Sequence, residues 1–246
     1  MKNKIIILII CFSAFSLSTK AQYQDLGGWY SASASFNLNK KWGFELKEEL
    51  RFNSNSLKLN KHLTDLQVNF KHTKWLKYGL GTRYYFDKTK DGFWENALRL
   101  NFDLMLKFKY EKFSILSRTR LQSSLNPKNT IGRMHSDEAL IREKITIRYN
   151  LKKYNIKPFI SGELFVEDYF VFGDITGNQK PKIKFESNNF RLKLGVDYKV
   201  NKRNYIKFSY GYQQELNQIF NQRDFLISIK YTYKLIIKKR ENDKIN

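Results

Sequence analysis

Hydrophobic and polar residues alternate along residues 94–108 for longer than in an ordinary strand of a soluble protein. Side chains on a strand point alternately to opposite faces, so this pattern predicts one apolar face and one polar face. Strands of soluble proteins usually have about 5–6 residues, whereas a tilted strand needs about 9–11 residues to cross a bilayer. The apolar positions are Trp94, Leu98, Leu100, Phe102, Leu104, Leu106 and Phe108. We therefore expect a strand with lipid on one side and water or packed polar groups on the other.

Alternation of this kind, stronger or weaker, occurs in eleven segments of the chain, and the connections between the segments alternate in length. Short connections lie at 39–41, 73–74, 109–112, 152–155 and 201–204, and longer ones at 53–61, 87–93, 126–137, 171–188 and 216–223. Outer-membrane barrels have short periplasmic turns and longer outer loops. The pattern predicts an all-β fold, a transmembrane antiparallel up-and-down barrel with short periplasmic turns and longer outer loops.

The number of strands is harder to predict, because eleven is odd and bacterial single-chain barrels have even strand numbers. We expect twelve strands, with residues 22–28 as a short additional strand or as a segment that threads the lumen. Ten strands is the alternative, if one weak segment is not a strand.

The N-terminus has the pattern of a secretory signal peptide. Lys2 and Lys4 precede an apolar stretch at residues 5–15, and small and polar residues lead to Ala21. Cleavage after Ala21 divides the chain into a signal peptide at 1–21, a barrel at 22–235 and a charged periplasmic tail at 236–246. The expected location is the outer membrane of a Gram-negative-type bacterium.

Charge and cysteine content narrow the possible partners and sites. The formal net charge is +22, and removing Lys2, Lys4 and Lys20 with the signal peptide lowers it to +19. An exported chain meets little nucleic acid, so outer-membrane lipid and lipopolysaccharide phosphates are the expected partners, together with the barrel-assembly machinery. The alternative is that lysines near the turns merely lie at the headgroup regions. The lone Cys11 lies in the signal peptide, so the mature chain has no disulfide or thiolate site.

Four tryptophans lie near the starts of the alternating runs: Trp29, Trp42, Trp75 and Trp94. Indole prefers the headgroup level of a membrane, where one end of the ring is in an apolar environment and the other is hydrated. We expect these residues to form an interfacial girdle, and burial in a core is the alternative.

Several short motifs resemble one known family. The start GGW, the second run WGFELKEELRF with Glu45, Glu48, Glu49 and Arg51, the run GLGTRYYF and the aromatic ending IKYTY together resemble the outer-membrane barrels grouped as domain of unknown function 2490. The resemblance spans nearly the whole mature chain and implies an outer-membrane barrel fold. It implies no biochemical activity, because the family has no agreed one.

The faces opposite the apolar positions carry charges of both signs. The candidates for the lumen are Glu45, Glu49, Arg51, Arg83, Glu95, Arg99, Asp103, Arg118, Arg120, Arg148, Glu163, Glu167, Arg191 and Asp197. In a barrel these side chains converge, so packed pairs would close the lumen and separated rows of charge would line a narrow pore. Unpaired buried charges are unfavourable and both signs are present, which favours ion pairs that fill the lumen.

The sequence contains no pattern that indicates a catalytic or metal site. The chain has three histidines, and His135 beside Ser136 in a loop does not make a catalytic triad, because a base must be oriented toward its nucleophile. Glu45 and Glu49 share a face, but carboxylates among arginines are usually salt-bridged. We expect no metal, no cofactor and no enzymatic activity.

A narrow channel or passive transport barrel is the leading function. The alternative is a structural or interaction barrel with a salt-bridge-filled lumen that acts through its outer loops, and a lipid-modifying enzyme is a distant third.

Overall fold

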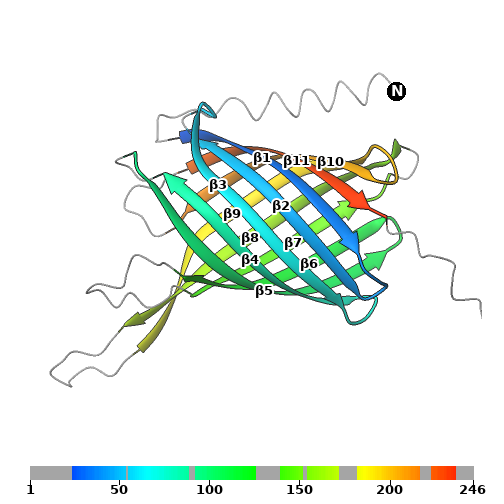
Figure 1. The fold of residues 1–246 in the computed structure, drawn as a ribbon, viewed down its shortest axis with the longest axis horizontal. Helices are drawn as coiled ribbons and strands as arrows, with labels where there is room; N and C mark the ends of the chain where they lie inside the picture. Colours follow the sequence, from blue (N-terminus) through cyan, green and yellow to red (C-terminus); the bar gives the residue numbers. More distant parts are fainter. Residues whose placement is uncertain are drawn as a thin grey trace, which may run out of the picture.

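In a computed structural model of the chain, the described residues are 24–53, 55–88, 92–125, 139–151, 154–171, 182–216 and 223–236. They form eleven strands that close into one barrel (Figure 1). The strands are β1 (Gln24–Asn37), β2 (Trp42–Asn53), β3 (Lys58–Lys71), β4 (Leu76–Lys88), β5 (Trp94–Tyr110), β6 (Phe113–Leu125), β7 (Ala139–Tyr149), β8 (Ile156–Val171), β9 (Lys182–Lys199), β10 (Asn204–Glu215) and β11 (Arg223–Leu235). The all-β antiparallel barrel predicted from the alternation is confirmed. No helix of the described residues is long and apolar enough to cross a membrane.

The barrel has one strand fewer than the twelve expected, because it closes by pairing β1 with β11. Each strand pairs antiparallel with its neighbour in the chain, but β1 and β11 pair in parallel, from Gln24 opposite Arg223 to Phe36 opposite Leu235. With an odd number of strands the first and last run in the same direction, so their ladder must be parallel. Residues 24–28, expected in an additional strand, are the first residues of β1.

Three of the short turns use the same device. A side-chain oxygen in the turn accepts hydrogen bonds from the backbone N–H groups two and three residues later, as in Asx and ST turns. Asn39 Oδ1 accepts from Lys41 and Trp42, both at 2.8 Å, and Asn201 Oδ1 accepts from Arg203 and Asn204 at the same distance. Thr73 Oγ1 makes the equivalent bonds in the β3–β4 turn. All three turns lie at one end of the barrel, and the end of β6 and the beginning of β7 lie at the other.

The two faces of the sheet are the reverse of those of a soluble protein. Large apolar side chains such as Leu66, Leu80 and Leu194 are exposed on the outside, and Leu80 is 64% exposed. The interior instead holds a few buried apolar side chains, among them Leu63 and Phe159, and a larger set of buried polar ones. The buried polar residues are Ser33, Glu49, Asn69, Arg83, Asn101, Asp103, Arg120, Gln122, Thr146, Ser161, Glu163, Arg191 and Ser209.

Two local features shape the sheet. Strands β8 and β9 are among the longest and extend beyond the rest of the barrel at the end of the long connections (Figure 1). Gly195 lies where β9 comes closest to its neighbours: a Cβ there would lie 2.3 Å from the carbonyl oxygen of Phe208 and 2.6 Å from the ring of Phe159. A side chain at this position has no space, which explains the glycine.

Candidate functional site

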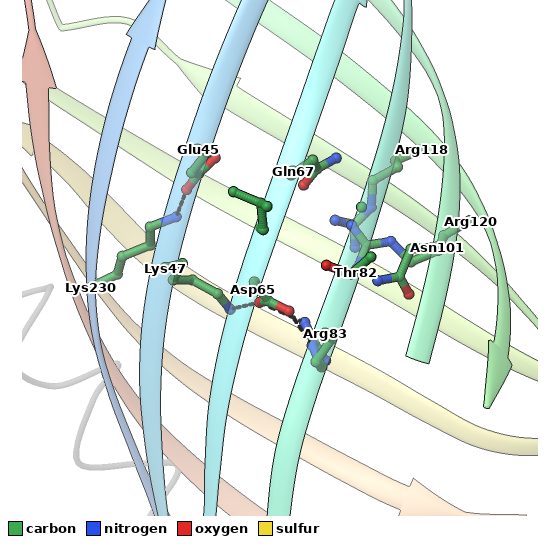
Figure 2. Close-up of a pocket in the computed structure, with 12 residues that line it drawn as sticks. Glu45, Lys47, Asp65, Gln67, Thr82, Arg83, Asn101, Arg118, Arg120 and Lys230 are labelled. Atoms are coloured by element: carbon green, nitrogen blue, oxygen red, sulfur yellow. Dashed lines mark hydrogen bonds and ion pairs between the residues drawn. The ribbon is translucent and has the colours of Figure 1, made fainter. Parts of the chain in front are cut away.

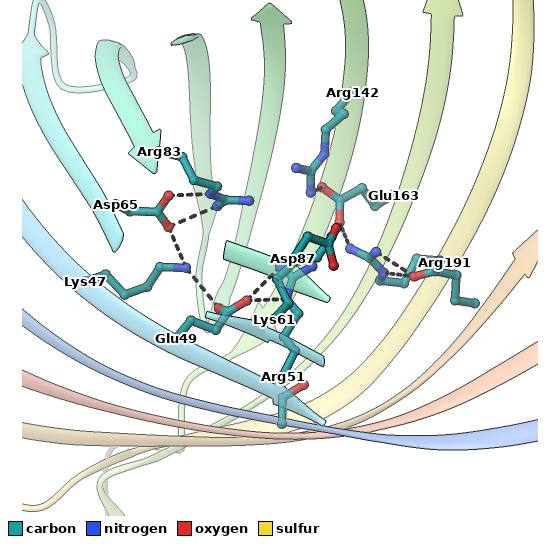
Figure 3. A network of polar contacts seen from close by, with 12 residues as sticks. Lys47, Glu49, Arg51, Lys61, Asp65, Arg83, Asp87, Arg142, Glu163 and Arg191 are labelled. Atoms are coloured by element: carbon teal, nitrogen blue, oxygen red, sulfur yellow. Dashed lines mark hydrogen bonds and ion pairs between the residues drawn. The ribbon is translucent and has the colours of Figure 1, made fainter. Parts of the chain in front are cut away.

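The lumen of the barrel is the candidate site, and its first part is a chain of ion pairs across β2, β3 and β4. Lys47 Nζ lies 2.9 Å from Glu49 and 2.7 Å from Asp65. Arg83 binds Asp65 through two nitrogens, and Arg51 lies 2.7 Å from Glu49 (Figure 3). These side chains alternate with the outward apolar ones, so strand periodicity alone places them inside.

The second part is the pair of Asp103 on β5 and Arg120 on β6. Arg120 donates to both carboxylate oxygens, at 2.5 and 2.7 Å, and the amide of Gln67 donates to Asp103 at 2.7 Å. Asp103 is 1% exposed and Arg120 5%. Nearby, Gln122 donates to Asn101 at 2.6 Å. The geometry is that of a hydrogen-bonded layer whose two charged side chains are almost completely buried.

The third part is centred on Glu163 on β8, which is 3% exposed. Its carboxylate lies 2.6 Å from Arg142, 3.2 Å from Arg191, 3.3 Å from Arg118 and 3.8 Å from Lys144. Among the described residues, every salt bridge of these four cations ends on Glu163. We call these five residues the Glu163 cluster. It draws its members from β6, β7, β8 and β9, and it carries more positive than negative charge.

Trp29 corrects the predicted girdle, because its ring lies inside the barrel. Arg51 lies 4.0 Å from the ring centroid, Lys193 4.2 Å and Arg191 4.8 Å. A cation over an indole face is a favourable contact, so Trp29 stabilises cations that converge from β2 and β9. Trp29 points inward because its neighbour Tyr30 points outward, and adjacent side chains on a strand face opposite sides.

The other three tryptophans of the predicted girdle, Trp42, Trp75 and Trp94, are exposed on the outer surface. Trp42 and Trp75 lie at the end of the short turns, where β2 begins and β4 is about to begin. Trp94 begins β5 at the opposite end. These positions fit aromatic residues at the two edges of an apolar band.

Two cavities lie along the lumen and share one lining residue. The inner cavity, of about 150 Å³, lies between β2, β4 and β6 and includes Lys47, Arg83 and Arg118 in its wall (Figure 2). The larger cavity, of about 580 Å³, opens at the end of the short turns. Glu45 lines both, and Lys230 Nζ lies 2.6 Å from its carboxylate. The Glu45–Lys230 pair therefore lies between the two spaces.

The larger cavity is strongly basic, and we call it the lysine vestibule. Its walls contain the lysines Lys40, Lys41, Lys71, Lys77, Lys202 and Lys234. Glu45 is the one acidic residue among the described residues that line it. Lysines of separate turns thus gather around one opening, and their common field attracts anions.

The remaining predicted lumen residues lie nearer the ends of the barrel. Arg148 Nε lies 2.9 Å from Asp197, and both side chains are partly exposed. Arg99 contacts Tyr85, whose hydroxyl lies 3.5 Å away. Glu95 faces inward at the rim and is exposed. The side chain of Glu167 lies outside the described residues, as do His135, Ser136, the predicted signal peptide and residues 237–246 of the predicted tail.

Several interior residues are absent from the set predicted from sequence. Asp65, Arg142 and Lys230 take central positions in the ion pairs, and each lies one residue from an outward apolar side chain. Strict application of the same alternation would have found them. No group of three or more His, Cys, Asp or Glu side chains that could hold a metal occurs in the part of the chain that the structure describes.

Two carboxylates break the apolar pattern of the outer face, and each is bonded to the next strand. Glu48 accepts from Thr64 at 2.9 Å and lies 2.8 Å from a ring nitrogen of His62. Glu143 accepts from Ser117 at 2.6 Å and from Thr119 at 2.5 Å. These partners explain how a carboxylate is tolerated on an otherwise apolar surface.

Comparison with known proteins places the chain in a family. No curated protein matches it. The family described as a protein of unknown function (DUF2490) matches residues 26–224, which covers most of the chain and almost the whole barrel. The motifs from the start of β1 to β4 lie in the matched region, whereas the aromatic ending IKYTY at residues 229–233 lies outside it. The chain therefore belongs to the DUF2490 family.

Proposed function

We propose that this chain is an outer-membrane β-barrel whose lumen is closed to passive flow, so that it acts by binding rather than by conducting. Three features support insertion in a membrane: the exposed apolar outer face, the polar interior, and the separation of short turns from long connections. Exposed apolar surface of this extent is unfavourable in water and favourable in lipid. Outer-membrane lipid, including lipopolysaccharide, is the proposed surrounding.

The closed lumen rests on one observation, the near-complete burial of charges in the middle of the barrel. Asp103, Arg120 and Glu163 are each no more than 5% exposed. A side chain that lined an open aqueous pore would be accessible to water. The ion pairs fill the space that a channel needs, which favours the salt-bridge-filled alternative over the narrow channel expected from sequence. The pairing of Glu45 and Glu49 with cations also supports a role without catalysis.

A narrow channel remains the second candidate, because a cavity lies on either side of the Glu45–Lys230 pair. Rearrangement of that pair would join the lysine vestibule to the inner cavity. A conducting state would then favour anions, since the vestibule is basic.

Single-channel conductance of the purified, folded mature chain in a planar bilayer tests the proposal. We expect no steady current when a gel-shift assay shows that the inserted protein is folded. The matched comparison is Arg99→Glu, which changes a charge near one end of the barrel and leaves the Asp103–Arg120 pair in place. Steady conductance whose ion selectivity shifts in Arg99→Glu would refute the closed lumen and establish the channel.

A further inference from the structure

The Glu163 cluster is unbalanced in charge. Arg142, Arg191 and Arg118 each donate a hydrogen bond to Glu163, at 2.6, 3.2 and 3.3 Å, whereas Lys144 lies 3.8 Å away. One carboxylate therefore faces four cations. Glu163 is 3% exposed, and the side chains of the cations range from 10% exposed for Arg191 to 26% for Lys144. Buried charge is stable only when it is paired, because the interior solvates ions poorly. The cluster lacks negative charge.

The cluster also lacks hydrogen-bond acceptors. The Nε atoms of Arg118 and Arg142 are buried and have no partner among the described residues. Buried nitrogen donors are nearly always bonded in native structures, and an unmet donor is unfavourable. The aromatic faces near the cluster do not remove the deficit: Arg142 and Arg191 both lie over Phe165, at 4.6 and 4.7 Å, but a ring face carries only partial negative charge.

The inner cavity provides the space in which an acceptor can lie. Arg118 is the member of the Glu163 cluster that lines this cavity of about 150 Å³, together with the amides of Gln67 and Asn101 (Figure 2). The wall also holds two carboxylates, Glu45 and Asp65, and four further cations, Lys47, Arg83, Arg120 and Lys230, so cations outnumber carboxylates. A site needs roughly 10–15 Å³ to hold one water molecule, so this one has space for a group of several heavy atoms. The other arginines in its wall, Arg83 and Arg120, are held by carboxylates through two nitrogens each. Arg118 is the arginine of this wall that is least satisfied.

We propose that the inner cavity binds a small tetrahedral oxyanion of the phosphate or sulfate type, held by Arg118 and by the excess positive charge of the Glu163 cluster. An oxyanion supplies both what the cluster lacks, a counter-charge and acceptor oxygens for arginine donors. The lysine vestibule attracts such anions toward the barrel, and the Glu45–Lys230 pair lies between it and the inner cavity. The inference goes beyond a closed lumen, because binding does not require a current.

Isothermal titration of inorganic phosphate into the folded mature chain in detergent, at constant ionic strength, tests the site. We expect saturable binding. Arg118→Gln should weaken it roughly 10- to 100-fold, as expected when one charge-assisted hydrogen bond is lost. Glu163→Gln should tighten it, because the substitution removes the competing negative charge. The matched control is Arg148→Gln, which removes an equal charge from a pair outside the cluster and should leave the affinity unchanged.

The outcomes separate the oxyanion site from its alternatives. Absence of saturable binding, equal loss in Arg118→Gln and Arg148→Gln, or weaker binding in Glu163→Gln would each overturn the proposal. If Arg118→Gln does not fold, Lys144→Gln replaces it, since Lys144 is the most distant cation of the cluster, and weaker binding is again expected. Glycerol phosphate, the size of a lipid headgroup, should bind poorly in a cavity of about 150 Å³. Binding of glycerol phosphate alone would point to lipid and against a free oxyanion.

Discussion

Replacing Arg120 by methionine should destabilise the barrel strongly, because the substitution leaves Asp103 buried without its cation. Removing one partner of a buried ion pair typically costs about 3–5 kcal/mol. Asp103 keeps one hydrogen bond, from Gln67 at 2.7 Å, so we expect a loss near the low end of that range, about 3 kcal/mol. The double variant Asp103→Leu/Arg120→Met should recover most of it, because an apolar pair of similar volume is often neutral.

The matched control for this experiment is Arg148→Met. Arg148 makes the same kind of pair with Asp197, but their side chains are 24% and 30% exposed. An exposed pair contributes about 0–1 kcal/mol, so this variant should stay within that range of the unmodified protein. The comparison thus isolates burial as the cause.

Urea unfolding of the folded chain in lipid vesicles, followed by tryptophan fluorescence, measures these differences. A urea dependence of about 1–3 kcal/mol per molar converts a 3 kcal/mol loss into a midpoint shift of about 1–3 M. The reasoning is refuted if Arg120→Met and Arg148→Met lose equally little stability. Such a result would mean that water reaches Asp103 and that the lumen is open at this level.

Three further substitution experiments follow from the fold. Gly195→Ala should lower the free energy of unfolding by about 1–3 kcal/mol or more in the same assay, because its Cβ would overlap the backbone of Phe208. The control Gly162→Ala should be tolerated, because its Cβ would lie 3.8 Å from the nearest side chain. Equal losses in the two variants would contradict the packing described. Leu80→Lys should cost about 2–4 kcal/mol if the outer face meets lipid near the middle of the bilayer, and a change below about 0.5 kcal/mol, typical of a water-exposed surface, would argue against insertion. In single-tryptophan variants, quenchers attached to lipid chains should quench Trp42 but not the interior Trp29, and quenching of both would place Trp29 outside.

The alternation of side chains predicted the strands and their faces because it is a local property. β5 shows this most clearly: Leu100 and Phe102 are exposed on the outer face, and the alternate residues Asn101 and Asp103 are buried on the inner face. The same alternation, applied to Tyr30 as an outward residue, already requires Trp29 to face inward. The error on Trp29 came from its place near the start of a run, which outweighed the periodicity.

Other features depend on contacts between distant parts of the chain. The strand number is set by the pairing of β1 with β11, whose residues are about as far apart in sequence as the chain permits. The sequence pattern within either strand does not predict that the two strands pair in parallel. Likewise, the four cations of the Glu163 cluster come from β6, β7 and β9, and their convergence on one carboxylate depends on register and curvature. Sequence periodicity gives the face of each residue but not its partner across the lumen.

In the proposed membrane-spanning orientation, the parallel ladder between β1 and β11 places the beginning of β1 and the end of β11 on opposite sides of the bilayer. Gln24 lies beside Arg223 and Phe36 beside Leu235, so β1 begins at the rim of the long connections and β11 ends at the rim of the short turns. A label placed just before β1 and one placed just after β11 would therefore be in different compartments, whereas an even-stranded barrel presents both in the same one. In the proposed orientation, assembly would therefore have to bring the beginning of β1 and the end of β11 to opposite sides of the bilayer.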